Sequence, residues 1–237
     1  MTWSIVARDA SGAFGVAIAT RFFAVGALCP HAESGVGALS TQALVNPHYG
    51  RQGLELLRAG VPAPEVVKRL VAPDEGREHR QLHVVDAQGR IGQFTGAQCV
   101  DWCGAVHGGG FSVAGNMLAN ERVIRETAKA YEHSKASFPE KLIAALEAGE
   151  AAGGDKRGKQ SAALLVFSSE QYPDLDLRVD DAAEPLAELR RLYEKAQERF
   201  VPYLGCSPSK ARPWGIFDRD QIERAIQSFQ TARGRSS

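Results

Sequence analysis

The sequence has no excess of charge of either sign and no long hydrophobic run. Its 237 residues hold 28 Lys and Arg against 28 Asp and Glu, so no global field would draw the chain to nucleic acid or anionic lipid. A run of about 18 apolar residues, which a membrane-spanning helix needs, does not occur. Arg8 and Asp9 stand where a signal peptide would have its apolar stretch. We therefore expect a cytoplasmic protein that binds neither nucleic acid nor membrane.

Cysteine is also scarce, and the usual motifs of metal and phosphate sites are missing. The chain has 4 Cys, which we expect to be reduced thiols because no export signal is present. Cys99, Cys103 and His107 are evenly spaced, but a structural zinc site uses a second, well-separated pair of ligands. The stretch 153–161 lacks the residue order of a Walker phosphate loop, and no GxSxG motif is present for a serine hydrolase. We expect no metal and no cofactor.

The composition is that of a globular protein with groups of strands and helices. With 44% hydrophobic residues, 24 Gly and 11 Pro, the chain is neither low-complexity nor disordered as a whole. Apolar alternation and short apolar runs predict strands at 2–8, 14–20, 36–41, 81–86, 90–95, 110–115, 161–167 and 175–179. Helical spacing predicts helices at 46–60, 64–72, 120–131, 138–150 and 185–200, and a last helix capped by Asp218. This order favours a layered α+β fold over strict βαβ alternation.

The end of the chain differs from the rest. Residues 203–214 contain or adjoin Pro202, Pro208 and Pro213, which is typical of a linker. We expect one domain over residues 1–203. Over 204–237 we expect a linker, a short helix and a tail that is disordered from residue 231.

The first candidate for chemistry is Thr2, directly after the initiator methionine. Removal of that methionine would leave a threonine whose own α-amine could take the hydroxyl proton, so that nucleophile and base belong to one residue. The alternative is an ordinary processed N-terminus. If the first two strands form a hairpin in which Arg8 pairs with Ala13, Thr2 lies opposite Ala19 and Arg21 follows on the same face.

Four further features could serve such a site. Arg21 would favour the neutral amine and could bind a substrate carboxylate, unless it forms only a surface ion pair. Ser4 shares the face of Thr2 and is either a supporting hydroxyl or a solvent-facing strand residue. The segment 40–42 ends a strand before a helix, where backbone N–H groups could receive an oxyanion. The charged, glycine-rich loop 153–161 either binds substrate or is a flexible, solvated connection.

Several stretches together form a recognisable family pattern. They are MTWSIVARD, GVAIATRFFAVGALCP, STQALVNPHYG, REHRQLHVVD, FSVAGNML and GGDKRGKQSAALLV, followed by DLRVDD and PLAELRRLY. From Thr2 to about Tyr203 the chain resembles the bacterial domain-of-unknown-function 1028 family, which is grouped with the N-terminal-nucleophile hydrolases. The resemblance implies a four-layer αββα sandwich, in which helices cover two antiparallel sheets.

The chain is also similar, more faintly, to proteasome-type subunits, in which a strand begins with the nucleophilic threonine. That similarity implies that Thr2 is the nucleophile and that Asn116, in the stretch FSVAGN, lies near it. It also implies that Asp155 and Ser161 flank the site from the second sheet. Such subunits have a lysine close to the threonine, whereas no lysine precedes Lys68 here.

Together these features predict an N-terminal-nucleophile amidohydrolase that cleaves a small polar or anionic amide. The predicted catalytic residues are Thr2, Arg21 in place of the lysine, Asn116 and Asp155. The predicted substrate-binding residues are Ser4, Thr41, Gln42, Arg157, Gln160 and Ser161. Two alternatives stay open, a non-catalytic αββα binding or assembly module and a cell-wall amide hydrolase. By analogy with other αββα proteins, we expect a homo-oligomer, a dimer or larger.

Overall fold

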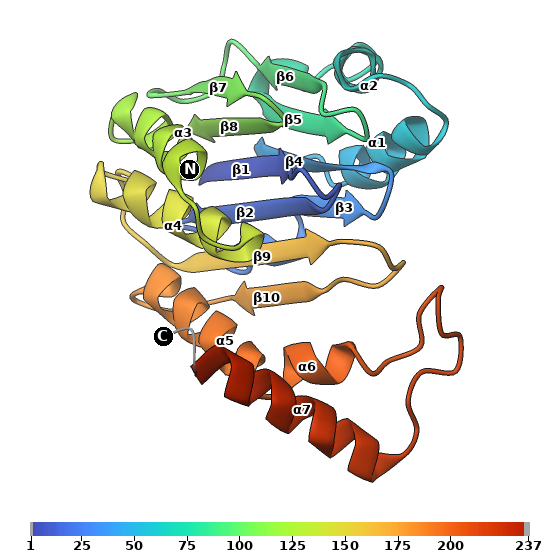
Figure 1. Ribbon diagram of the computed structural model, residues 1–237. Helices are drawn as coiled ribbons and strands as arrows, with labels where there is room; N and C mark the ends of the chain where they lie inside the picture. The colour runs from blue at the N-terminus through green and yellow to red at the C-terminus, as the bar shows by residue number, and fades with distance from the viewer. Residues whose placement is uncertain (1, 235–237) are drawn as a thin grey trace. The chain divides into compact units, whose positions relative to one another are not determined.

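The computed structural model describes residues 2–234 and contains two antiparallel β-sheets that pack face to face (Figure 1). The larger sheet consists, in spatial order, of β10 (Leu175–Val179), β9 (Ser161–Phe167), β2 (Phe14–Thr20), β1 (Thr2–Arg8), β8 (Phe111–Asn116) and β7 (Gly104–Gly108). The smaller sheet consists of β3 (Pro30–Glu33), β4 (Gly37–Ala43), β5 (Arg80–Asp86) and β6 (Ile91–Thr95). The strand that begins at Thr2 is therefore central in the larger sheet, between β2 and β8.

Two pairs of helices cover the outer faces of the sheets (Figure 1). α1 (His48–Arg58) and α2 (Ala63–Val71) pack on the smaller sheet through an apolar core that includes Leu39 of β4. α3 (Arg122–His133) and α4 (Phe138–Ala151) pack on the larger sheet. The arrangement is a four-layer αββα sandwich, which confirms the predicted fold class.

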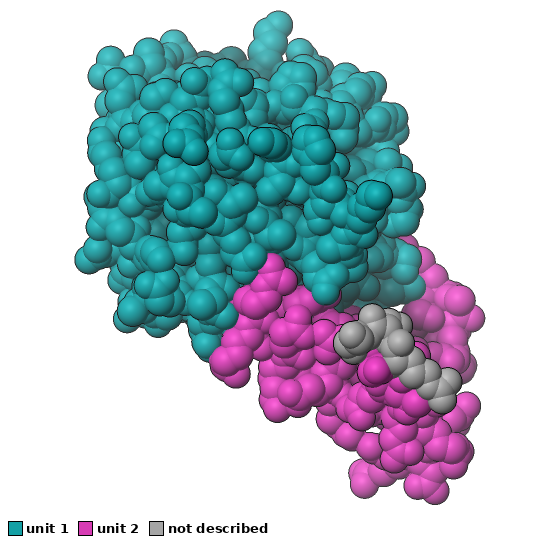
Figure 2. Space-filling model, turned by 60° about the vertical axis from the view of Figure 1, so that its left-hand side comes forward, with its two compact units in different colours: residues 1–189 teal, residues 190–237 magenta. Residues whose placement is uncertain are grey.

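The described chain forms two compact units, which Figure 2 shows in different colours. They comprise residues 1–189 and 190–237, whereas the predicted domain boundary lies at residue 203. The remaining helices are α5 (Pro185–Glu198), α6 (Phe200–Leu204) and α7 (Arg219–Gly234).

The last helix is longer than the sequence pattern predicts. Asp218 caps it as expected, since its Oδ1 accepts hydrogen bonds from the backbone N–H groups of Asp220 and Gln221 over 2.9 and 3.2 Å. The helix then continues to Gly234, so residues 231–234 are helical and the prediction of disorder is wrong there. Residues 235–237 lie outside the described part of the chain.

The first hairpin has a register one residue away from the predicted one. Arg8 pairs with Phe14, not with Ala13. The reason is the loop closure, in which the backbone N–H of Asp9 bonds to the carbonyl of Ala13 over 2.9 Å and the Asp9 carboxylate accepts from the Ala13 N–H over 2.9 Å. The Asp9–Ala13 pair therefore belongs to the turn, and the register along both strands shifts with it.

The sequence pattern misses three short elements, β3, β7 and α6. In the strands β3 (PHAE) and β7 (GAVHG), proline or glycine interrupts the apolar alternation. The helix α6 (FVPYL) is short and contains a proline. Short 3₁₀ turns also occur at Val25–Ala27 (η1) and Arg77–His79 (η2). Among residues 2–234, no helix has both the length and the apolar character that crossing a membrane requires.

The two faces of β1 meet different layers. Val6 packs between the sheets with Phe14, Ala38 and Val85. Because side chains alternate along a strand, Ser4 and Thr2 share the inward face of Val6. The layer between the sheets is thus apolar at the hairpin end of β1 and becomes polar toward Thr2.

Candidate functional site

Thr2 opens the central strand of the larger sheet with a polar residue opposite it on each side. It pairs with Thr20 at the end of β2 and with Asn116 at the end of β8. The Oγ1 of Thr2 donates a hydrogen bond to the Oγ1 of Thr20 over 3.1 Å. Residues paired across neighbouring strands point to the same face, so the three residues form one row, which we call the Thr2 row. Met1, whose removal the sequence-based mechanism requires, lies outside the described residues.

Asp155 anchors the loop beside the Thr2 row. Its buried carboxylate accepts hydrogen bonds from the backbone N–H groups of Arg21 and Arg157, each over 2.8 Å. It also accepts one from Nη2 of Arg157 over 3.3 Å. Because Arg21 follows Thr20 directly, this carboxylate fixes the end of β2 against the loop that precedes β9.

Arg21 is exposed at the edge of the Thr2 row. Since Thr20 and not Ala19 lies opposite Thr2, Arg21 follows the row directly instead of lying two residues beyond it. Its Nη1 donates to the carbonyl of Arg157 over 2.9 Å, and it meets no carboxylate side chain among residues 2–234. Its guanidinium is therefore able to receive an anion from outside the chain.

Ser161 holds the loop that follows β2, and Gln160 is bonded to the segment after β10. Ser161 pairs with Thr20 and belongs to the same sheet as Thr2, so the predicted placement on the second sheet is wrong. Its hydroxyl donates to the carbonyl of Phe22 over 2.5 Å and accepts from the N–H of Val25 over 3.2 Å. The side-chain amide of Gln160 donates to Asp181 over 3.1 Å. The Ser161 side chain therefore fixes the backbone of the loop after β2, whereas the Gln160 side chain bonds to another side chain.

Beneath the Thr2 row, a continuous hydrogen-bonded network fills the space between the sheets. Gln81 determines which groups donate and which accept in this network. Its Nε2 donates to the carbonyl oxygen of Gly115 over 2.9 Å. Its Oε1 therefore accepts, from Nε2 of Gln42 over 2.7 Å and from Nδ2 of Asn116 over 3.0 Å. Gln42 then presents its own Oε1 to the hydroxyl of Ser4 at 2.6 Å. Ser4 and Gln42 are fully buried and support the row from below.

Thr41 lies on the other face of β4 and does not join this network. Its side chain donates to the carbonyl of Asn46 over 3.3 Å, and its backbone N–H donates to the carbonyl of Cys29 over 3.1 Å. Alternation along β4 turns the Thr41 side chain toward the layer of α1 and α2, away from the Thr2 row. The strand also continues past Gln42 to Ala43 instead of ending there.

His83 continues the buried network, and its neighbours decide its tautomer. The Ser4 hydroxyl donates its hydrogen to Gln42, so it can only accept from His83. Nε2 of His83, which lies 2.8 Å from that hydroxyl, is therefore protonated and donates to it. Nδ1 then accepts from Ser112 over 2.8 Å, and Ser112 accepts from Nε2 of Gln93 over 2.8 Å. His83 and both serines are 0% exposed, so this Ser–His contact is structural and cannot reach a substrate.

A pH dependence of stability follows from this histidine. Burial lowers the pKa of His83 to about 3, whereas an unfolded histidine has a pKa of about 6.5. Below pH 6.5 or so the unfolded chain binds a proton that the native state excludes, so stability should fall with pH by up to about 1.4 kcal/mol per unit. Ring ¹⁵N NMR should show the Nε2–H tautomer of His83 without titration down to about pH 4. Titration of the His83 ring near pH 6.5 would contradict this.

Comparison with known proteins now assigns the family. A family model described as "Family of unknown function (DUF1028)" matches residues 2–189. The chain belongs to this family. The crystal structure of protein SPO2555 from Silicibacter pomeroyi, also a DUF1028 protein, has a TM-score of 0.86 and 32% sequence identity, covering 92% of this chain and 96% of that one.

More distant comparisons add little to the DUF1028 assignment. Anbu (ancestral beta-subunit) from Yersinia bercovieri is similar over 82% of this chain and 94% of that one, at a TM-score of 0.37 and 12% identity. That likeness is too weak to support an argument about function. No match is found among curated proteins.

Three residues of this DUF1028 site were not predicted from the sequence, namely Thr20, Gln81 and His83. Thr20 was not predicted because the expected register placed Ala19 opposite Thr2. Gln81 and His83 alternate along β5 and face the polar alternation of β4, where Ser40 and Gln42 lie. Polar residues two apart on adjacent buried strands are the signal that could have found the network.

The loops at the Thr2 end of the DUF1028 domain are joined in a closed ring, which we call the loop ring. It consists of residues 21–29, 44–46, 96–103 and 153–160. The first two loops share an apolar cluster that includes Val25, Cys29 and Val45. Arg80 joins the second loop to the third, because it donates to the carbonyl of Leu44 over 2.5 Å and accepts from the thiol of Cys99 over 3.3 Å.

The ring closes through the loop of residues 153–160. Nζ of Lys156 donates to the carbonyl of Asp101 over 2.6 Å, and Arg157 is joined to the first loop through Arg21. Within residues 2–234, the non-glycine residues with left-handed φ are Ala24 (52°), Ala43 (68°) and Met117 (55°). Such conformations cost energy and are concentrated at functional sites. Of the three residues, Ala24 lies in the loop ring and Ala43 directly precedes its second loop, while Met117 donates its N–H to the carbonyl of Val100 in its third loop.

Proposed function

We propose that this DUF1028 protein is an N-terminal-nucleophile amidohydrolase that cleaves the C–N bond of a small amide at Thr2. The observation that carries the proposal is the Thr2 row, in which the hydroxyl of the threonine that begins β1 is hydrogen-bonded to Thr20 and faces Asn116. The row rests on a buried polar network, which holds its members in place. Strained residues with left-handed φ occur in the loop ring or next to it.

The mechanism requires the α-amine of Thr2 to be free. The amine takes the hydroxyl proton while Oγ1 bonds to the substrate carbonyl carbon, and it passes that proton to the leaving amine as the C–N bond breaks. An ester on Oγ1 remains. Water then hydrolyses the ester, which releases the acid and restores the hydroxyl. Thr20 accepts the hydrogen bond of Thr2 and would orient Oγ1 before attack.

Two neighbours are suited to roles beside the nucleophile. The Oδ1 of Asn116 has no hydrogen-bond partner among residues 2–234, and we place the α-amine of Thr2 against it. For the oxyanion we propose a backbone N–H of the turn after Gln42, where Ala43 has a φ of 68°. Asp155 would not take part in proton transfer. By accepting from three N–H groups of Arg21 and Arg157, it would hold the end of β2 beside Thr2.

An experiment on the N-terminus tests the proposal. Protein expressed without an N-terminal fusion should lack Met1 by intact mass. A β-lactone that acylates N-terminal threonines should add one label, located on Thr2 by peptide mapping. Thr2→Ser should still be labelled and Thr2→Ala should not, with amide hydrolysis slowed by about 10³-fold or more. The matched control, Thr231→Ala in α7, should behave as the unaltered protein.

Retention of Met1, or equal labelling of the Thr2→Ala variant, would contradict the proposal. The non-catalytic binding module would then be the better description. Hydrolysis confined to peptidoglycan fragments would instead point to the cell-wall alternative. Each outcome is separable because labelling reports the nucleophile and hydrolysis reports the substrate.

A further inference from the structure

Among residues 2–189, the large exposed hydrophobic side chains all lie in the loop ring. Among the described residues up to 189, the large hydrophobic side chains that are exposed are Phe22, Phe23, Leu28, Leu44 and Val100. Phe22 and Phe23 are each 59% exposed and Leu44 is 61% exposed. They come from three loops that contact one another around the Thr2 row. A group of this kind on an otherwise polar surface marks a place where an apolar ligand binds.

Cations without side-chain partners lie in the same ring. The side chains of Arg21 and Lys156 donate only to backbone carbonyl oxygens, and neither side chain forms an ion pair among residues 2–234. The carboxylates of the ring are Asp101 and Asp155, and Asp155 already accepts three hydrogen bonds from N–H donors. The ring therefore has two cationic side chains able to receive a carboxylate from a ligand.

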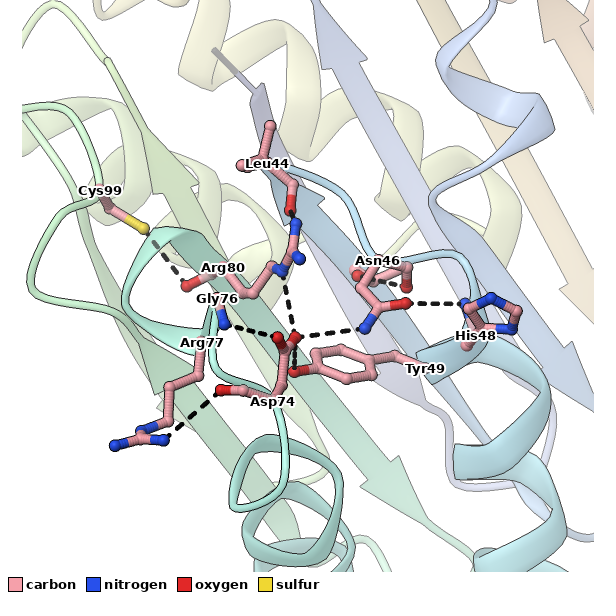
Figure 3. Close-up of polar contacts among 10 residues, drawn as sticks. Leu44, Asn46, His48, Tyr49, Asp74, Gly76, Arg77, Arg80 and Cys99 are labelled. Atoms are coloured by element: carbon pink, nitrogen blue, oxygen red, sulfur yellow. Dashed lines mark hydrogen bonds and ion pairs between the residues drawn. The ribbon is translucent and has the colours of Figure 1, made fainter.

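The position of Leu44 in this ring is fixed from outside by a second polar cluster, shown in Figure 3. Asp74 lies at its centre and accepts from the Tyr49 hydroxyl over 2.6 Å and from Nε of Arg80 over 3.1 Å. The hydrogen bond from Tyr49, with those from Arg80 and Gly76, holds the pKa of Asp74 well below its usual range. Arg80 also holds the Leu44 carbonyl, and in Figure 3 the Leu44 side chain points away from this cluster. The apolar rim is thus carried by an anchored loop.

We infer that the loop ring binds amides that join an apolar acyl chain to an amino acid with a free carboxylate. This inference rests on the proposed function, since it names the substrate class of the same site. Phe22, Phe23 and Leu44 would hold the acyl chain, and Arg21 with Lys156 would hold the carboxylate. The amide bond lies between these two parts of such a molecule, which suits the place of Thr2 within the ring.

A second copy of the chain fits the ring less well than such a ligand. In a two-fold dimer the same surface of both copies forms the interface, so carboxylates of the ring in one copy would have to pair with Arg21 and Lys156 of the other. Of the two carboxylates in the ring, Asp155 is buried and occupied. A small ligand that brings its own carboxylate satisfies both cations without that requirement.

Binding to the Thr2→Ala variant tests the inference without interference from turnover. The probes are octanoylglycine, octanoylglycinamide, which lacks the carboxylate, and acetylglycine, which lacks the chain. By calorimetry, octanoylglycine should bind about tenfold or more tightly than either of the others. Adding Phe22→Ser and Phe23→Ser should remove most of the preference for the octanoyl chain. Adding Arg21→Gln should remove the preference for the carboxylate, while Phe217→Ser, an exposed aromatic outside the ring, should change neither.

Equal affinity for the three probes, or no binding of octanoylglycine up to about 10 mM, would overturn the inference. So would rim substitutions that change the sedimentation mass and leave binding unaltered, because the rim would then be an interface between copies. Selective binding without hydrolysis by the unaltered protein would support the ligand class and count against the proposed function. Hydrolysis by the unaltered protein without selective binding of octanoylglycine would support the proposed function and count against the ligand class.

Discussion

Replacing Gln81 with leucine is expected to lower the free energy of unfolding by about 4 kcal/mol, a large effect for one substitution. The Gln81 side chain accepts from Gln42 and Asn116, and donates to Thr95 and to the carbonyl of Gly115. Leucine of similar size would leave these groups buried without partners, at a cost of about 1–3 kcal/mol for each one that finds no replacement. Urea denaturation measures the loss directly.

The matched control for this substitution is Gln98→Leu. Gln98 is exposed, and within residues 2–234 its side chain makes no hydrogen bond, while its backbone N–H donates to the carbonyl of Glu78 over 2.8 Å. We expect a change within about 0.5 kcal/mol there. Similar stability losses in the two variants would show that the network between the sheets does not stabilise the fold. They would also remove the physical basis for treating it as the support of the Thr2 row.

Replacing Gly92 with alanine is expected to destabilise the protein by about 3 kcal/mol, through overpacking between β6 and α2. A Cβ at this position would lie 2.3 Å from the carbonyl oxygen of Ala63 and 2.7 Å from its carbon. The helix cannot easily retreat, because the N–H of Ala63 donates to the buried carboxylate of Asp86 over 3.0 Å. Backbone atoms must therefore shift, which is more costly than a side-chain rotation.

Gly109→Ala is the control for this second substitution. No atom lies within 4 Å of a Cβ built on Gly109, and its φ lies outside the left-handed range. Its thermal and urea midpoints should stay close to those of the unaltered protein. A Gly92→Ala protein as stable as the Gly109→Ala protein would mean that α2 adjusts its distance from the smaller sheet freely.

Local patterns were sufficient for most of the fold. Strands β9 (Ser161–Phe167) and β10 (Leu175–Val179) have the predicted bounds, because apolar runs of strand length end at polar or glycine-rich segments. The strand β7 was missed because GAVHG contains too few apolar residues to show alternation. Its place as the outermost strand beside β8 depends on pairing between backbones, which the side-chain pattern does not reveal.

The candidate site was predictable only in part, for a similar reason. The place of Thr2 at the start of a strand follows from its neighbours in sequence. Asn116, at the end of another strand, was expected near it from the family resemblance and lies directly opposite. Thr41 and Gln42 are adjacent in sequence, yet one faces a helix layer and the other the space between the sheets. Which of the two side chains points inward depends on which face of β4 packs against the larger sheet.

By itself, the sequence determined the order of strands and helices, the layered α+β class and the position of Thr2 at the head of a strand. These properties depend on periodicity and turn residues within short segments. Only the tertiary structure decided that Thr20 lies opposite Thr2, that Gln81 and His83 join the buried network, and that four separate loops meet in one ring. Hairpin closure and the stacking of two sheets set those relations, and both depend on contacts between residues far apart in the chain.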